Sequence, residues 1–144
     1  MYYYIEPEVA GGLGDNSIID TSCHPPKITL LEYKFEGWLG VDLLESFPCF
    51  IITKRLADAI SKIPLSGFGL LPVKISKSEN FIENHSQVKL PEFQWLKIYG
   101  SAGIDDFGLT QNYDLVISKP VLEILRGFNI KLAELHTYPQ RNPI

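Results

Sequence analysis

The sequence predicts a single α+β domain in which two or three helices pack on a mixed or mostly antiparallel sheet. Short apolar segments rich in β-branched and aromatic residues predict strands, and segments of turn-forming residues separate them. Two segments of similar pattern predict a strand that leads directly into a helix. The 144 residues show no break in composition, so one domain is expected to cover residues 1–144.

Strands are expected at residues 2–6, 27–35 and 93–100, the last because aromatic and aliphatic residues dominate "FQWLKIYG". A short helix is expected within residues 78–85, with Ser78 as its N-cap. The segments "VAGGLGDN", "CHPP", "SAG" and "NY" have the composition of turns. The chain should therefore contain more strand than helix.

The segments "FIITKRLADAI" (residues 50–60) and "LVISKPVLEIL" (residues 115–125) share one pattern. An apolar triplet predicts a buried strand, Thr53 or Ser118 takes the N-cap position, and apolar residues then recur at helical spacing. Apolar segments follow each helix, so residues 50–75 and 115–138 are expected to form two similar strand–helix–strand units. Two explanations stay open: an internal repeat, or the pattern common to any efficient strand-to-helix junction.

The chain has a formal net charge of −4, and this charge is unevenly distributed. The first 50 residues carry eight acids and two bases, whereas residues 51–100 carry seven bases and four acids. An acidic balance argues against a nucleic-acid partner, because phosphate binding needs clustered Lys and Arg. The asymmetry suits a basic protein partner, whose approach it would steer.

Two features of the sequence bear on location. No stretch of about 18 apolar residues occurs, so no transmembrane helix and no membrane partner are expected. The N-terminal "MYYYIEPEVAGGLGD" lacks the basic and apolar regions of a signal peptide, so a cytoplasmic location is expected. Cys23 and Cys49 form no CxxC motif and are expected to be free, buried thiols.

The sequence contains no convincing catalytic, metal or cofactor motif. "GGLG" at residues 11–14 lacks the Lys-Ser/Thr of a phosphate-binding loop and predicts a surface turn. The three histidines are scattered along the chain without metal-ligand spacing. Asp105 and Asp106 are adjacent among glycines, which predicts a flexible loop with two negative charges rather than an acid–base pair. A non-enzymatic protein without cofactor is therefore expected.

Three longer segments resemble those of a known group of proteins: "EGWLGVDLLESFPCFIITKRLADAI", "LPEFQWLKIYGSAGIDDFGL" and "LVISKPVLEILRGF". They are similar to small bacterial proteins of the immunity-protein families, which are encoded beside polymorphic and contact-dependent toxins. The resemblance covers about residues 30–138. It implies an inhibitor that binds one cognate toxin and blocks its active site or an essential surface. It supplies no catalytic residue.

The residues that would contact such a partner are expected in Gly-rich or loop-like segments, where aromatic and charged side chains are accessible. Two other functions stay open: a small-molecule-binding domain, in which the two strand–helix units frame a pocket, and a hydrolase whose carboxylates meet only in the folded chain. The expected protein-binding residues are Trp38, Asp42, Glu45, Asp105, Asp106 and Tyr113.

Overall fold

The computed structural model describes residues 1–139 and confirms the α+β class, with two four-stranded sheets at its centre. The first sheet has the order β11-β12-β1-β13 and consists of β11 (Phe107–Leu109), β12 (Leu115–Ser118), β1 (Tyr2–Glu6) and β13 (Glu134–Tyr138). The second sheet has the order β6-β7-β10-β8 and consists of β6 (Leu43–Ser46), β7 (Cys49–Thr53), β10 (Phe93–Ile98) and β8 (Phe68–Leu71). All neighbouring strands in these sheets are antiparallel.

The two sheets have the same arrangement. In each sheet, the first strand of a hairpin (β6 or β11) pairs with the second strand (β7 or β12), which leads into a helix. On its other side the second strand pairs with β10 or β1, and this third strand pairs in turn with the strand that follows the helix, β8 or β13. Helix α1 (Lys54–Ile60) connects β7 to β8 around β10, and α3 (Lys119–Leu125) connects β12 to β13 around β1. This correspondence supports the interpretation of residues 50–75 and 115–138 as an internal repeat, which stays a prediction.

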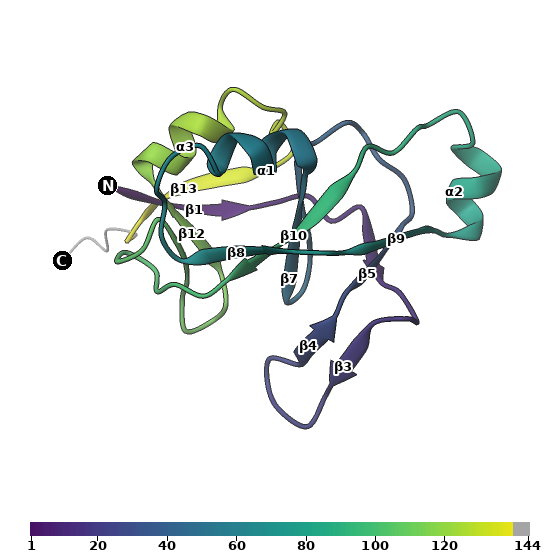
Figure 1. Ribbon diagram of the computed structural model, residues 1–144, viewed down its shortest axis with the longest axis horizontal. Coiled ribbons are helices and arrows are strands. Elements are labelled where there is room, and N and C mark those ends of the chain that lie inside the picture. Colours follow the sequence, from purple (N-terminus) through teal and green to yellow (C-terminus); the bar gives the residue numbers. More distant parts are fainter. Residues whose placement is uncertain (140–144) are drawn as a thin grey trace.

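Two isolated bridges join the sheets into a ring of six strands: β6, β7, β10, β11, β12 and β1. Beyond β1, Glu8 bridges to Leu44 of β6, and beyond β10, Ser101 bridges to Leu109 of β11. The strands β7 and β12 run from a hairpin turn to a helix, so the ring has a hairpin end and a helix end. The helices α1 and α3 lie side by side at the helix end (Figure 1).

The interior of the ring is filled by the apolar positions of the repeated pattern. Ile52 and Ile117 face inward from the sheets, and Ile60 and Leu125 face inward from the helices. All four side chains are almost fully buried. Burial of side chains of this size contributes about 1.5–3 kcal/mol each, so the shared pattern accounts for much of this core.

The helix caps differ from one another. Ser78 caps α2 (Glu79–Asn84) as expected, since its hydroxyl accepts a hydrogen bond from the Phe81 amide. Ser118 caps α3 in the same way, through the amide of Val121. Thr53 occupies the N-cap position of α1, but its side chain makes no cap hydrogen bond. The expectation that Thr53 would accept such a bond was wrong, because its hydroxyl bonds to a buried carboxylate instead.

A smaller sheet covers the outer face of the second sheet. This cover sheet has the order β2-β5-β9, made of β2 (Gly11–Leu13), β5 (Glu32–Phe35) and β9 (Lys74–Lys77). Tyr33 and Phe35 of the cover sheet join Ile51 and Trp95 of the second sheet in a separate core. The hairpin of β3 (Ile18–Asp20) and β4 (Lys27–Leu30) projects beyond this layer (Figure 1).

Two sequence-based expectations fail in the cover layer. "GGLG" is not a surface turn, because its first three residues form β2. Gly11 is required there, since a Cβ atom at this position would lie 2.0 Å from the Lys34 carbonyl oxygen. Both cysteines are free, but Cys23 is exposed rather than buried. None of the described helices is long and apolar enough to cross a membrane.

Candidate functional site

Asp42 lies at the helix end, where its carboxylate holds three segments together. Its Oδ1 accepts hydrogen bonds from the Thr53 hydroxyl at 2.5 Å and from Arg55 Nε at 2.8 Å. Its Oδ2 accepts from Arg55 Nη2 at 2.6 Å and from the Asn129 amide at 2.8 Å. Asp42 is only 1% exposed, so this carboxylate is not available to a partner.

Asp106 has the equivalent position beside the first sheet. Its Oδ1 accepts from the Ser118 hydroxyl at 2.7 Å, and its Oδ2 accepts from the Ser66 amide at 2.9 Å. Each of the two aspartates thus bonds to the N-cap residue of its own unit and to the loop after the helix of the other unit. These reciprocal bonds fasten the two units to each other.

The hydrogen bonds also decide the charge of both groups. Burial alone would raise the pKa of Asp42, but the bonds from Arg55 and Thr53 outweigh it and hold the pKa below its usual range. Burial opposes a low pKa at Asp106 as well, and the bonds from Ser66 and Ser118 again lower it. Both aspartates are therefore ionised structural groups.

Asp105 and Trp38 are also engaged within the fold. Asp105 Oδ2 accepts a hydrogen bond from the Ser101 amide at 2.9 Å, which makes residues 101–105 a hydrogen-bonded turn rather than a loop with two free charges. Trp38 is half-buried, and its Nε1 donates to the Val41 carbonyl at 2.9 Å. Its indole packs edge-on against Phe93 of the second core. Neither side chain is directed freely to solvent.

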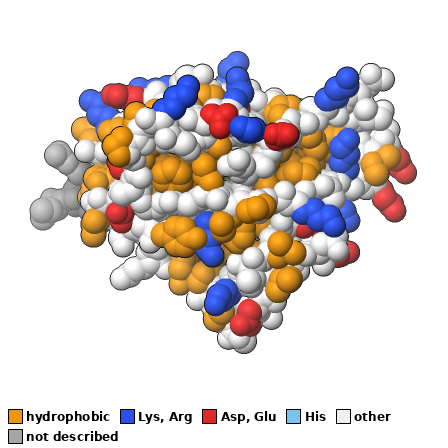
Figure 2. Space-filling view, viewed as in Figure 1, with side chains coloured by type: hydrophobic (Ala, Val, Ile, Leu, Met, Phe, Trp, Pro, Cys, Tyr) orange, Lys and Arg blue, Asp and Glu red, His pale blue; other side chains and the backbone are white. Residues whose placement is uncertain are grey.

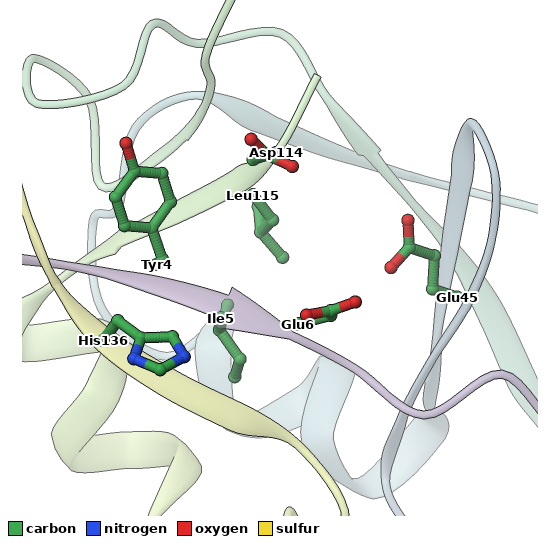
Figure 3. A pocket seen from close by; sticks show the side chains of 7 residues that line it. All are labelled: Tyr4, Ile5, Glu6, Glu45, Asp114, Leu115 and His136. Carbon is green, nitrogen blue, oxygen red and sulfur yellow. The ribbon is translucent and has the colours of Figure 1, made fainter. Parts of the chain in front are cut away.

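The hairpin end carries a different kind of site, which we call the acidic pocket (Figure 3). It is a hollow of about 380 Å³ between β1, β6, the start of β12 and β13. Three carboxylates face it from three separate segments, and Figure 3 shows them around one opening with an imidazole beside them. Its lining residues are Tyr4, Ile5, Glu6, Glu45, Asp114, Leu115 and His136.

Glu45 is the least exposed of the three carboxylates, and its environment disfavours the charged form. Burial, together with the negative charges of Glu6 and Asp114, raises the pKa of Glu45 to about 7. Glu6 and Asp114 are exposed. Among residues 1–139, none of the three carboxylates takes part in an ion pair. A cation in the pocket would therefore be stabilised by all three.

An aromatic triad lies beside the acidic pocket, where three loops converge. The rings of His24, Phe47 and Tyr113 lie 5.9–6.5 Å apart between centroids, and Phe47 is 46% exposed. Tyr113 immediately precedes Asp114, and Phe47 follows Glu45 by two residues. Two of the three rings thus come from the same two hairpins that supply Glu45 and Asp114.

The sequence-predicted residues divide between the two ends of the ring. Glu45 and Tyr113 lie together at the hairpin end, whereas Asp42 and Asp106 lie at the helix end. The remaining residues of the surface were missed because each is ordinary in its own segment. One signal was present: in "YYYIE" the alternation of a strand places Tyr2, Tyr4 and Glu6 on one face. The missed residues are Tyr4, Glu6, His24, Phe47, Asp114 and His136.

The surface combines carboxylates with aromatic rings. Among residues 1–139, no hydrogen bond connects His136 to a carboxylate, and no three His, Cys, Asp or Glu side chains are grouped closely enough to hold a metal ion. Aromatic side chains beside unpaired charges are the groups that contribute most to protein–protein binding. No known family model matches the sequence, and no curated protein is significantly similar to it.

Proposed function

We propose that this protein is a non-enzymatic, protein-binding module that acts as an immunity protein, inhibiting a cognate toxin by binding it. The proposal includes the cytoplasmic location expected from the sequence. The observation that carries it is the hairpin-end surface, in which three carboxylates that form no ion pair within residues 1–139 share their hairpins with an aromatic triad.

The charge of this surface defines the partner. A toxin domain that acts on nucleic acid needs a basic active-site surface, and an acidic inhibitor gains association rate and specificity from complementary charge. A Lys or Arg side chain of the toxin would enter the acidic pocket, while Phe47 and Tyr113 pack against apolar surface around it. A stable complex needs about 800 Å² of buried surface on each partner, which is larger than the pocket and triad alone and includes the neighbouring face of the first sheet.

Co-expression tests the proposal. The gene beside this one should be toxic when expressed alone and harmless when this protein is expressed with it. The variant Glu45→Lys/Asp114→Lys should lose protection, whereas Glu83→Lys/Glu123→Lys, an equal change in charge at exposed helical sites, should retain it. A neighbouring gene that is harmless, or whose toxicity persists despite this folded protein, would contradict the proposal.

A second candidate function is hydrolysis, and one observation favours it: Glu45, with a pKa of about 7, shares a pocket with His136 and two other carboxylates. Against it, Glu6, Asp114 and His136 are exposed, and no Ser, Thr or Cys is among the described residues that line the pocket. A panel of ester, phosphoester and glycoside substrates distinguishes the two functions. Turnover that disappears in Glu45→Gln would support hydrolysis. Equal background rates for the unmodified chain and for Glu45→Gln would contradict this second function.

A further inference from the structure

The strand β13 forms an open edge of the first sheet, next to the acidic pocket. It pairs with β1 over five consecutive residues without a bulge, and it is the last strand in the sheet order. Among residues 1–139, its backbone forms hydrogen bonds only with β1. Every second residue of β13 therefore directs an N–H and a C=O group away from the sheet.

Native proteins usually protect such an edge with Lys, Pro, a bulge or a covering segment. Within Glu134–Tyr138 there is no Lys, Pro or bulge, and Glu134, His136 and Thr137 are exposed. The edge is long enough to accept another strand, and its unsatisfied backbone groups would contribute hydrogen bonds to it.

The face beside this edge has a defined order of side chains. Directly paired residues share a face of a sheet, so Tyr2 and Tyr138 form one row, Tyr4 and His136 the next, and Glu6 and Glu134 the third. An added strand would place one side chain about 5 Å from Glu134 between Cβ atoms, and about 10 Å from Glu6 on the next strand. A side chain four residues further along would lie opposite Tyr138.

We infer that the partner of this protein binds by adding an extended segment to β13, with a Lys or Arg side chain opposite Glu134 and an aromatic side chain opposite Tyr138. The cation would lie beside Glu134, on the side away from Glu6, and the aromatic ring would extend the contact between Tyr4 and Tyr138, whose centroids are 4.9 Å apart. This inference rests on the proposed function, since it states how the same basic partner is held.

Charge argues against two simpler alternatives. A second copy added to β13 in parallel register would place Glu134 beside the same acid of the other copy, and a fully overlapping antiparallel copy would place Glu134 opposite Tyr138, so neither supplies the cation that this row of acids would attract. The corresponding edge strand of the second sheet, β8, has no acid within Phe68–Leu71 and has Lys97 of the neighbouring strand opposite Gly69, so it offers a basic segment no counter-charge. Figure 2 shows apolar and basic side chains over β8 and β9 on that side of the molecule.

The test uses four capped seven-residue peptides and the full chain. TKVTVYT and TYVTVKT present a Lys and a Tyr four residues apart for the two possible strand directions, and TEVTVYT and TYVTVET are their charge-reversed controls. One Lys peptide should bind at least tenfold more tightly than its Glu control, and amide exchange at alternate residues of β13 should slow at least fivefold. Glu134→Lys should remove this preference, Glu134→Gln should reduce it, and Glu83→Lys should leave it unchanged.

Equal binding of Lys and Glu peptides, protection outside β13, or self-association of the chain through β13 would overturn the inference. The toxin complex separates this inference from the proposed function. If the toxin is neutralised while β13 amides exchange as fast as in the free chain, the binding mode is wrong and the function stands. If the Lys peptide protects β13 while toxicity persists, the edge binds a basic strand and the immunity function fails.

Discussion

The two central sheets share one strand order, but they use their outer faces differently. In the second sheet, the outward row Leu44, Ile51, Trp95 and Leu71 packs against the cover sheet. The corresponding row of the first sheet is Gly108, Val116, Tyr4 and His136. At every position the residue is smaller or more polar in the first sheet. One copy of the arrangement is thus covered by a further sheet, whereas the other leaves Tyr4 half-buried and His136 exposed.

The same difference separates the two ends of the ring. At the helix end, the acids Asp42 and Asp106 are satisfied by hydrogen bonds within the fold. At the hairpin end, Glu6, Glu45 and Asp114 have no ion-pair partner among residues 1–139. Acids that are hydrogen-bonded within the fold and acids that form no ion pair within residues 1–139 thus lie at opposite ends of one core.

The largest expected effect comes from the equivalent aromatic residues Trp95 and Tyr4. Trp95→Ala should lower the free energy of unfolding by about 4 kcal/mol, because it opens a cavity in the second core. Tyr4→Ala should cost about 1 kcal/mol, because Tyr4 is only half-buried and packs mainly against Tyr138 at the edge of the sheet. Urea unfolding measures both values. Similar losses for the two variants would mean that the outer faces are equivalent after all.

The next largest difference in stability is expected between variants of the equivalent aspartates Asp42 and Asp106. Asp42→Ala should destabilise the fold by about 3 kcal/mol, because it leaves the Thr53 hydroxyl and the Asn129 amide without their acceptor. Asp106→Ala should cost about 1–2 kcal/mol, since its site is more exposed. The same urea series measures this pair. A smaller loss for Asp42 than for Asp106 would contradict the structural role assigned to the buried carboxylate.

A smaller, pH-dependent effect is expected at Glu45. Its pKa is about 7 in the folded chain and about 4.5 when unfolded, so the folded state binds more protons between these values. The contribution of Glu45 to stability is therefore fully present below about pH 4.5 and is lost as the pH rises through 7. At pH 8, Glu45→Gln should be more stable than the unmodified chain by about 1–2 kcal/mol, a value that allows for solvent screening of the charges. At pH 4 the two proteins should be equally stable.

The control for this pH effect is Glu83→Gln, which changes one exposed carboxylate on α2. Its stability relative to the unmodified chain, measured at the same pH values, gives the effect of removing one exposed charge. If Glu45→Gln behaves in the same way, Glu45 titrates as an ordinary surface acid and the pocket is more solvated than its geometry indicates.

Local sequence signals predicted the elements whose causes are local. The strands β1 and β10, the helix α2 with its Ser78 cap, and the strand-to-helix junctions at residues 53–54 and 118–119 all follow from residues within a few positions. The strand β2 did not, because Gly11 is a strand residue only through its close approach to Lys34, more than twenty positions later. The Thr53 cap failed for the same reason, since its competing partner Asp42 lies just before β6, 11 positions earlier in the chain.

The site was only partly predictable because it depends on how the ring closes. Glu45 and Tyr113 were identified as accessible residues of turn-rich segments, but Glu6 and His136 reach the same pocket only when β1 lies between β12 and β13 and continues to β6. Asp42 was taken for a surface acid because its segment is rich in glycine. Its burial follows from contacts with Asn129, 87 positions away.

The most direct test of the central claim is the dissociation constant of the complex with the toxin encoded beside this protein. Two charge-matched variants are compared at physiological salt: Glu45→Lys/Asp114→Lys at the hairpin end and Glu83→Lys/Glu123→Lys on the helices. We expect the first variant to bind the toxin at least about 100-fold more weakly than the unmodified chain. The second variant should bind with an affinity within about threefold of the unmodified chain. Equal losses for both variants, or full affinity for the first, would contradict it.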